Sequence, residues 1–253
     1  MGLNPQFADL TGDGVLDLFT GCFEGGAYVC AGRKEGGFLQ PRALLDRGGR
    51  ILRLGQYWDD QKNEWTGVAD SKHKEALGIG VAAVDWDADG DLDLLLGSNE
   101  GGLYLRKNAG SAAQPSFELD SAQLMAKGAP IHVPGGHLIP AVADWDGDGQ
   151  FDLFSGSGAG GVWWWRNVGT KGAPKFAKER RLVADAIQGD SITEPKGPGQ
   201  RTQVCPTDFD GDGDLDLLIG DYHSSPYVEG KPWEHHGYVW LVARNPAPAA
   251  SGN

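Results

Sequence analysis

Short apolar runs bounded by glycine and aspartate recur along the chain. In one stretch, GVAAV at 80–84 precedes an aspartate-rich segment, DLLLG at 93–97 follows it, and LYLR at 103–106 comes after a glycine pair. A more variable run, SFELDSAQL at 116–124, completes the group. Runs of this length between turn residues predict β-strands. The helical signal is weak and limited to stretches such as AKERRLVADA from Ala177, so an all-β chain is expected.

The aspartate-rich segment occurs four times, and each copy is followed by a glycine at the same offset. The first aspartates of the copies are spaced by 76, 59 and 64 residues: Asp9, Asp85, Asp144 and Asp208. A period near 60 residues is typical of a repeated four-stranded antiparallel sheet. Stacking such sheets around an axis buries their faces and protects most strand edges. We therefore predict a β-propeller with four recognisable repeats.

These repeats assign most of the chain to one domain. The predicted organisation is a single propeller over 1–245, with repeats near 5–50, 79–135, 138–186 and 201–245, an insertion at 51–78 and a flexible tail at 246–253. The last copy ends soon after its third strand, so its outer strand has no evident donor. The chain could be a fragment, an unusually small propeller, or part of a ring completed by another chain. The insertion could cover the gap or cap a face.

Composition narrows the functional classes. The chain has 40 Gly, and 25 Asp against 10 Glu, which favours tight turns over a helical bundle. Its 35 acidic residues outnumber 22 Lys and Arg, and the formal net charge is −13, so a nucleic-acid partner is not expected. No apolar run approaches the roughly 20 residues of a membrane span, so membrane insertion is not expected either.

The aspartates of each copy occupy positions 1, 3, 5 and 9 of a loop that leads directly into a strand. The four loops hold 17 of the 25 aspartates, a density that is strongly repulsive unless a cation or protons bind. Alternate residues of a turning loop can converge, and a glycine after position 5 permits the sharp turn. The carbonyl at position 7 can add an oxygen, and an all-oxygen site suits Ca²⁺. An EF-hand is excluded because no loop has Glu at position 12.

These loops resemble the calcium-binding FG-GAP repeats of integrin-type propellers and the related VCBS repeats of secreted bacterial proteins. The resemblance covers most of the chain and implies up to four bound Ca²⁺. It implies side-chain ligands Asp9, Thr11, Asp13, Asp17, Asp85, Asp87, Asp89, Asp93, Asp144, Asp146, Asp148, Asp152, Asp208, Asp210, Asp212 and Asp216. It implies carbonyl ligands at Val15, Asp91, Gln150 and Asp214. Thr11 breaks the pattern, so the first site should be the weakest.

We expect a calcium-stabilised, non-enzymatic module that binds a protein or a glycan, as an adhesion protein does. A secreted, periplasmic or cell-surface location is expected from the ligand type and the resemblance, although the N-terminal MGLNPQFADL lacks the features of a signal peptide. One alternative is a carbohydrate-active enzyme similar to the propeller polysaccharide lyases. Another is a structural protein that self-associates to complete the ring.

Tryptophans supply the candidate ligand surface. Trp58, Trp65 and Trp233 are predicted in loops, where exposed rings can stack on sugars or anchor a protein. Packing between blades is the alternative use of these rings. Cys22 and Cys30 flank a Gly-Gly turn and could form a disulfide across a hairpin, or remain two unpaired strand residues.

Overall fold

The computed structural model describes residues 4–22, 25–55, 57–59, 61–66, 78–224 and 233–244. Every regular element in these ranges is a β-strand. No helix in the described part of the chain is long and apolar enough to cross a membrane.

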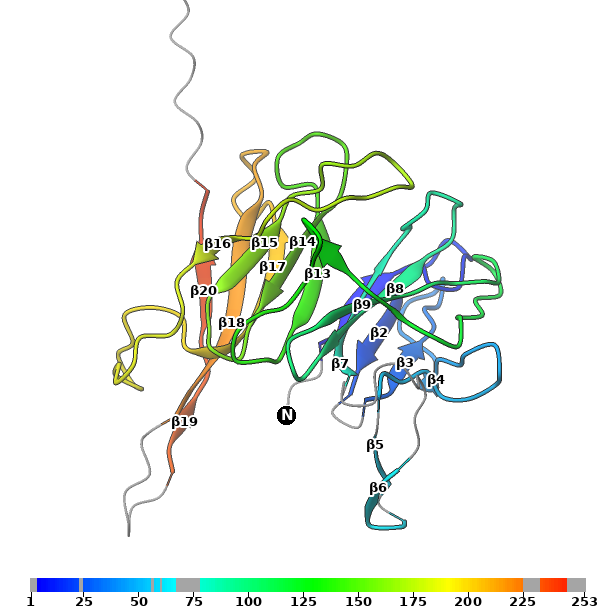
Figure 1. Ribbon diagram of the computed structural model, residues 1–253, viewed down its shortest axis with the longest axis horizontal. Helices are drawn as coiled ribbons and strands as arrows, with labels where there is room; N and C mark the ends of the chain where they lie inside the picture. Colours follow the sequence, from blue (N-terminus) through cyan, green and yellow to red (C-terminus); the bar gives the residue numbers. More distant parts are fainter. Residues whose placement is uncertain are drawn as a thin grey trace, which may run out of the picture.

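Four antiparallel sheets form a four-blade β-propeller, as predicted, and each blade takes its strands in chain order (Figure 1). Blade 1 contains β1 (Gln6–Ala8), β2 (Asp17–Gly21), β3 (Ala27–Cys30) and β4 (Arg42–Ala43). Blade 2 contains β7 (Gly78–Val84), β8 (Asp93–Ser98), β9 (Leu103–Arg106) and β10 (Ala122–Gln123). Blade 3 contains β13 (Ile139–Ala143), β14 (Asp152–Gly156), β15 (Val162–Trp165) and β16 (Arg180–Val183). Blade 4 contains β17 (Gln200–Thr207), β18 (Asp216–Ser224), β19 (His235–His236) and β20 (Val239–Val242).

Blade 4 differs from the others at its outer edge. β19 and β20 both pair with β18, so together they fill the third position of the sheet. No strand pairs with the far edge of β20 within the described ranges. The outer strand that the sequence left without a donor is therefore missing from this part of the chain.

Two small hairpins lie outside the blades. They are β5 (Tyr57–Asp59) with β6 (Glu64–Thr66), and β11 (Met125–Ala126) with β12 (Ala129–Pro130). Figure 1 shows the β5–β6 hairpin projecting away from the sheets.

Two local expectations change. The helical signal from Ala177 is wrong, because Arg180–Val183 forms the outer strand β16. All three cysteines are free. The register explains why no Cys22–Cys30 bond forms: the Cys22 amide donates to Gly26, whereas Cys30 lies opposite Leu18.

The core consists of three hydrophobic clusters, one between each pair of consecutive blades. Successive residues of a strand point to opposite faces, so a strand packed on both faces is buried throughout. β8 and β14 of the middle blades are buried at every residue, whereas β2 and the first five residues of β18 contain partly exposed positions. Blades 2 and 3 are thus covered on both faces, and blades 1 and 4 on one.

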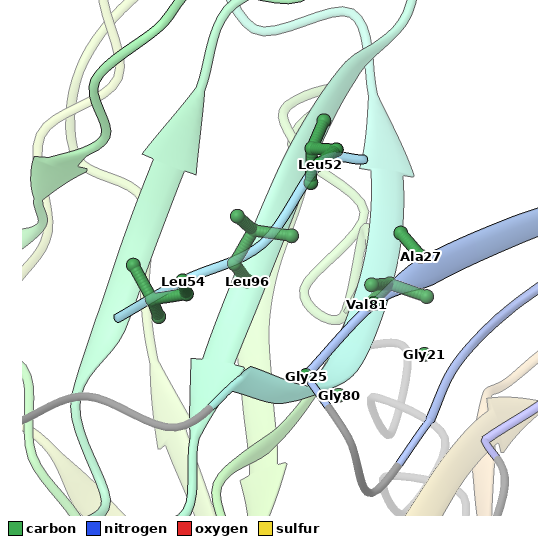
Figure 2. Close-up of a pocket in the computed structure, with 9 residues that line it drawn as sticks. Gly21, Gly25, Ala27, Leu52, Leu54, Gly80, Val81 and Leu96 are labelled. Atoms are coloured by element: carbon green, nitrogen blue, oxygen red, sulfur yellow. The ribbon is translucent and has the colours of Figure 1, made fainter. Parts of the chain in front are cut away.

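The chain segment after the fourth strand also enters these interfaces. Leu52 and Leu54 pack between blades 1 and 2, where Figure 2 shows them beside Leu96. Ile131 and Val133 have the same place between blades 2 and 3. The space left at the first interface is about 10 Å³, no more than one water molecule needs, so it is a packing gap rather than a ligand pocket.

A glycine at the end of the second strand lets each blade approach the next. A Cβ built on Gly97 would lie 2.0 Å from the carbonyl oxygen of Leu138, and one on Gly156 would lie 1.9 Å from that of Thr202. Both partners are backbone atoms of the following blade, so no side chain fits there. The glycine therefore serves the contact between blades.

Candidate metal centres

Each aspartate-rich loop joins the first strand of a blade to the second, and two turn positions shape it. Position 6 is a glycine with positive φ in every loop, such as Gly149 at 83°. Position 4 also has positive φ, and it is Gly12, Gly147 and Gly211 in three loops but Ala88 in the second. Only glycine adopts this backbone region without strain. The sequence thus bends each loop tightly enough for its alternate side chains to turn inward.

The aspartates at positions 1 and 5 fix the loop from within. Asp144 accepts hydrogen bonds from the amides of Asp148 and Gly149, at 3.0 and 2.9 Å. Asp148 in turn accepts one from the amide of Gln150, at 2.9 Å. Asp9 makes the same pair of contacts in the first loop. These bonds turn the backbone amides of the loop toward its own carboxylates.

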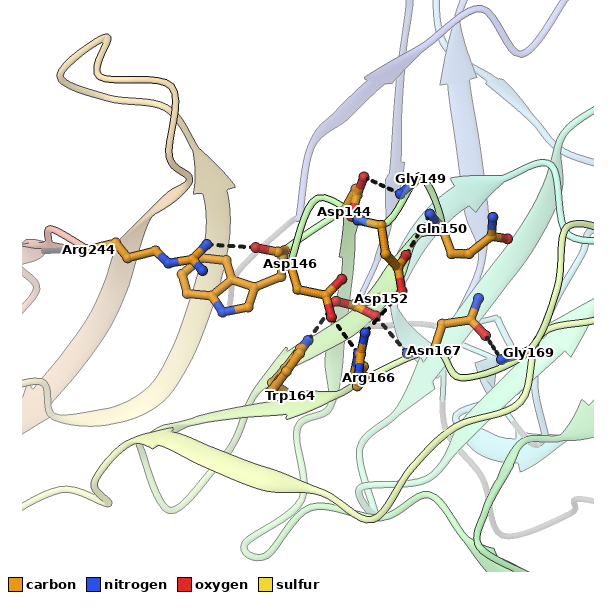
Figure 3. Close-up of polar contacts among 12 residues, drawn as sticks. Asp144, Asp146, Gly149, Gln150, Asp152, Trp164, Arg166, Asn167, Gly169 and Arg244 are labelled. Atoms are coloured by element: carbon orange, nitrogen blue, oxygen red, sulfur yellow. Dashed lines mark hydrogen bonds and ion pairs between the residues drawn. The ribbon is translucent and has the colours of Figure 1, made fainter. Parts of the chain in front are cut away.

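The buried aspartate at position 9 ties the loop to the third strand. Asp152 accepts hydrogen bonds from the Asn167 amide at 2.6 Å and from the Trp164 indole at 3.0 Å (Figure 3). Asp93 accepts the equivalent bond from the Asn108 amide at 2.7 Å. Burial raises the pKa of Asp93 to about 6, against the hydrogen bond from Asn108. The carboxylates of neighbouring loop residues add to the rise, so the metal-free loop holds unfavourable negative charge.

Carboxylate oxygens gather in three of the four loops. In each group, one ligand atom per residue lies within 4.8 Å of the others. Loops 2 and 3 contribute positions 1, 3 and 5, and loop 4 contributes positions 1, 3 and 9: Asp85, Asp87 and Asp89; Asp144, Asp146 and Asp148; Asp208, Asp210 and Asp216. The first loop forms no comparable group, and it is the loop in which Thr11 replaces a carboxylate.

The second loop passes a specific test for a cation. One carboxylate oxygen each of Asp85, Asp87 and Asp91 is buried without a hydrogen-bond partner. Burying such an oxygen unpaired is costly, and a hard cation held among Asp85, Asp87 and Asp89 would satisfy those of Asp85 and Asp87. The Thr11 hydroxyl of the first loop is also buried without a partner. The donor set is entirely oxygen, as Ca²⁺ requires. Asp216, at position 9 of the fourth loop, belongs to its group, whereas Asp212, at position 5, does not. The position-7 carbonyls, the position-9 aspartates of the other loops and the ligands of the first loop remain predictions.

Two basic residues beside the clusters were not anticipated. Lys107 contacts Asp87 at 2.5 Å. Arg166 pairs with Asp146 (Figure 3) and also with Asp148. The Lys107 ammonium lowers the pKa of Asp87. Both residues directly follow the third strand of their blade, at the same offset in the repeat. Aligning the copies through the third strand, LYLRK with VWWWR, would have revealed the pair.

The candidate ligand surface is only partly described. Trp58 and Trp65 were expected in loops, but they lie opposite each other in the β5–β6 hairpin, and their side chains fall outside the described part. Trp233 does lie in a loop and is 60% exposed. Its ring meets that of His235 edge-on, with centroids 5.6 Å apart.

The FG-GAP-like repeat family matches this chain twice, at residues 85–155 and 144–219. Together the two matches cover more than half of the chain and include three complete aspartate loops. The chain belongs to the FG-GAP repeat family. Each matched segment begins at the first aspartate of one loop and ends in the second strand of the next blade. The FG-GAP unit is therefore offset from the blade, because it joins the loop of one blade to the strands of the next.

A curated relative extends the similarity beyond the family match. The chain is 30% identical over 181 residues to cartilage acidic protein 1 of Xenopus tropicalis. The alignment covers 66% of this FG-GAP chain and 25% of the relative, so the chain spans about a quarter of that protein's length.

Proposed function

We propose that this FG-GAP propeller is an extracellular, non-enzymatic binding module whose blades are stabilised by calcium. The observation that carries the proposal is the second loop, where three carboxylate oxygens are buried without partners. Positions 1, 3 and 5 of the loops would supply carboxylates, and position 7 a carbonyl. A bound ion would neutralise their mutual repulsion and join the loop to its blade.

The extracellular assignment rests on the availability of calcium outside cells and on the similarity to a relative whose name places it in cartilage. All-oxygen calcium sites of extracellular modules are matched to the high calcium concentrations found outside cells. The name of the relative from Xenopus tropicalis places that protein in cartilage and describes it as acidic. This chain is acidic too, with a net charge of −13.

Calcium content and thermal stability test the metal part of the proposal. We expect the purified chain to retain three to four Ca²⁺ ions, one per loop, and to melt at a lower temperature in excess chelator. A ligand that binds only the native state stabilises it, by about 2.7 kcal/mol per site at 100 times its Kd. No retained calcium together with an unchanged melting curve would contradict the proposal.

A matched pair of variants tests the site itself. Asp146→Asn removes one charge from the third loop and should lower the calcium stoichiometry by one ion. Glu35→Gln removes one charge from an exposed turn outside the aspartate loops and should leave the stoichiometry unchanged. Equal calcium content in both variants would show that the third loop holds no ion.

The binding part of the proposal centres on Trp233. We expect the calcium-loaded chain to bind on a glycan array or a protein array. Trp233→Ala should weaken this binding at least tenfold, because exposed aromatic side chains are commonly binding hot spots. Trp233→Tyr keeps an aromatic face and should retain most of the affinity. Binding that is indifferent to both variants would remove Trp233 from the ligand surface.

A further inference from the structure

Consecutive blades always meet through the same two faces. The leading face of a blade packs on the next blade in the chain, and its trailing face packs on the preceding one. Strand register identifies the equivalent residues: Leu95 pairs with Leu105 in blade 2, Phe154 with Trp164 in blade 3, and Leu218 with Leu241 in blade 4. Those of blades 2 and 3 lie in the cluster shared with the next blade.

The leading face of blade 4 is apolar but exposed. It consists of Cys205, Phe209, Leu218, Val239 and Leu241. Val239 is 77% exposed and Leu241 is 45% exposed, whereas their equivalents Leu103 and Leu105 in blade 2 are buried. Phe209 is 58% exposed, although its equivalent Trp86 packs on blade 3.

Gly220 shows that this face has the form of an interface. It is the equivalent of Gly97 and Gly156, which must be glycine because the backbone of the next blade touches them. A Cβ on Gly220 would meet nothing within 4 Å. Gly220 is thus the residue that close packing between blades requires, at a position that no blade covers within the described residues.

Blade 1 exposes the complementary half of the contact. Its trailing face consists of Phe7, Leu16, Leu18 and Tyr28. Phe7 is 60% exposed and Leu16 is 59% exposed. The equivalent of Leu18 in each later blade is a buried leucine of an interface, such as Leu94 or Leu153.

The residues of the two faces match contacts already present in the molecule. Trp86 of blade 2 lies 5.8 Å from Phe151 of blade 3, measured between ring centroids. The equivalent residues on the free faces are Phe209 and Leu16. If blade 4 met a blade 1 in the way that blade 2 meets blade 3, the exposed side chains of Phe209 and Leu16 would come into contact. Figure 1 shows β20 of blade 4 and β4 of blade 1 on opposite sides of β13, so the two faces do not meet within one chain.

We propose that a second copy of this chain docks head-to-tail, with the leading face of blade 4 on the trailing face of its partner's blade 1. Two such contacts close a ring of eight blades, which lies within the range of known propellers. Head-to-tail contacts form closed rings when the rotation closes and open filaments when it does not. The inference concerns assembly and does not depend on calcium or on the ligand surface.

Sedimentation and light scattering of the chain in calcium-containing buffer test the assembly. We expect twice the chain mass of 26.9 kDa, in equilibrium with the monomer on dilution. A chain that is monomeric at every concentration overturns the proposal. The two exposed faces would then pack against further repeats or another protein. Species heavier than a dimer contradict the closed pair.

Two surface variants test which faces meet. Val239→Lys alters the leading face and Phe7→Lys the trailing face, and both positions are exposed, so each chain should keep the wild-type circular dichroism. Each variant alone should be monomeric, because every contact contains one altered face. An equimolar mixture should form dimers again, because one contact is then wild-type on both sides. If Phe7→Lys alone still dimerises, leading faces pair with each other and the head-to-tail arrangement is wrong.

Discussion

At the scale of single residues, the second loop carries a backbone strain that the other loops avoid. Ala88 has φ of 63° at a position where the three other loops have glycine. A side chain in this region costs energy because its Cβ crowds the following carbonyl. Ala88 is exposed, so its methyl group contributes little packing in return.

Ala88→Gly should therefore stabilise the chain. We expect a gain of about 1 kcal/mol, or a rise in melting temperature of about 2–4 °C for a chain of this size. The melt is measured in chelator, so that calcium affinity does not contribute. Ala113→Gly, at an exposed turn residue without positive φ, is the control and should be neutral or destabilising. If Ala88→Gly loses as much stability as the control, the backbone at Ala88 is not strained.

Residue spacing was enough to predict the loops, but not their basic partners. The positions of the aspartates and the turn glycines follow from local chain geometry, which the sequence states directly. Lys107 and Arg166 reach the clusters from the end of another strand, so their roles depend on cross-strand register. The buried oxygens of Asp85 and Asp87 likewise depend on tertiary packing.

At the scale of elements, the strands that are covered on both faces were the easiest to predict. The run DLLLG has no polar alternation because β8 is buried on both sides. The outer strand β16 gave a weak helical signal because RRLVADA contains strong helix formers. Its arginines are held in the sheet by tryptophans: Arg180 lies 5.2 Å from the ring of Trp164, and Arg181 lies 5.7 Å from that of Trp163. Such pairs favour the strand over local propensity.

The glycine that ends the second strand gives a prediction for a matched pair of blades. Gly156→Ala should destabilise the chain by about 2–3 kcal/mol, because its Cβ would force the backbone of Thr202 away. Gly220→Ala, in the monomeric Val239→Lys background, should change stability by less than about 0.5 kcal/mol. Denaturant unfolding measures both. Similar losses in the two variants would mean that the space beside Gly220 is filled.

At the scale of the whole molecule, the repeat period predicted the propeller but not its packing. Four copies indicated four blades, and the structure has them. The sequence left open how the last blade is completed, because strand count alone says nothing about which faces meet. Burial of equivalent positions supplies that information: the same apolar residues are covered in blades 2 and 3 and exposed in blade 4.

The chain order of strands within each blade has a consequence for how the protein is made. All strand partners of blade 3 lie between residues 139 and 183, and the next blade packs on a sheet that is already complete. Contacts this local in sequence form quickly, and synthesis delivers the chain from its N-terminus. Each blade can therefore fold as it leaves the ribosome, using the preceding blade as its template, without waiting for the end of the chain.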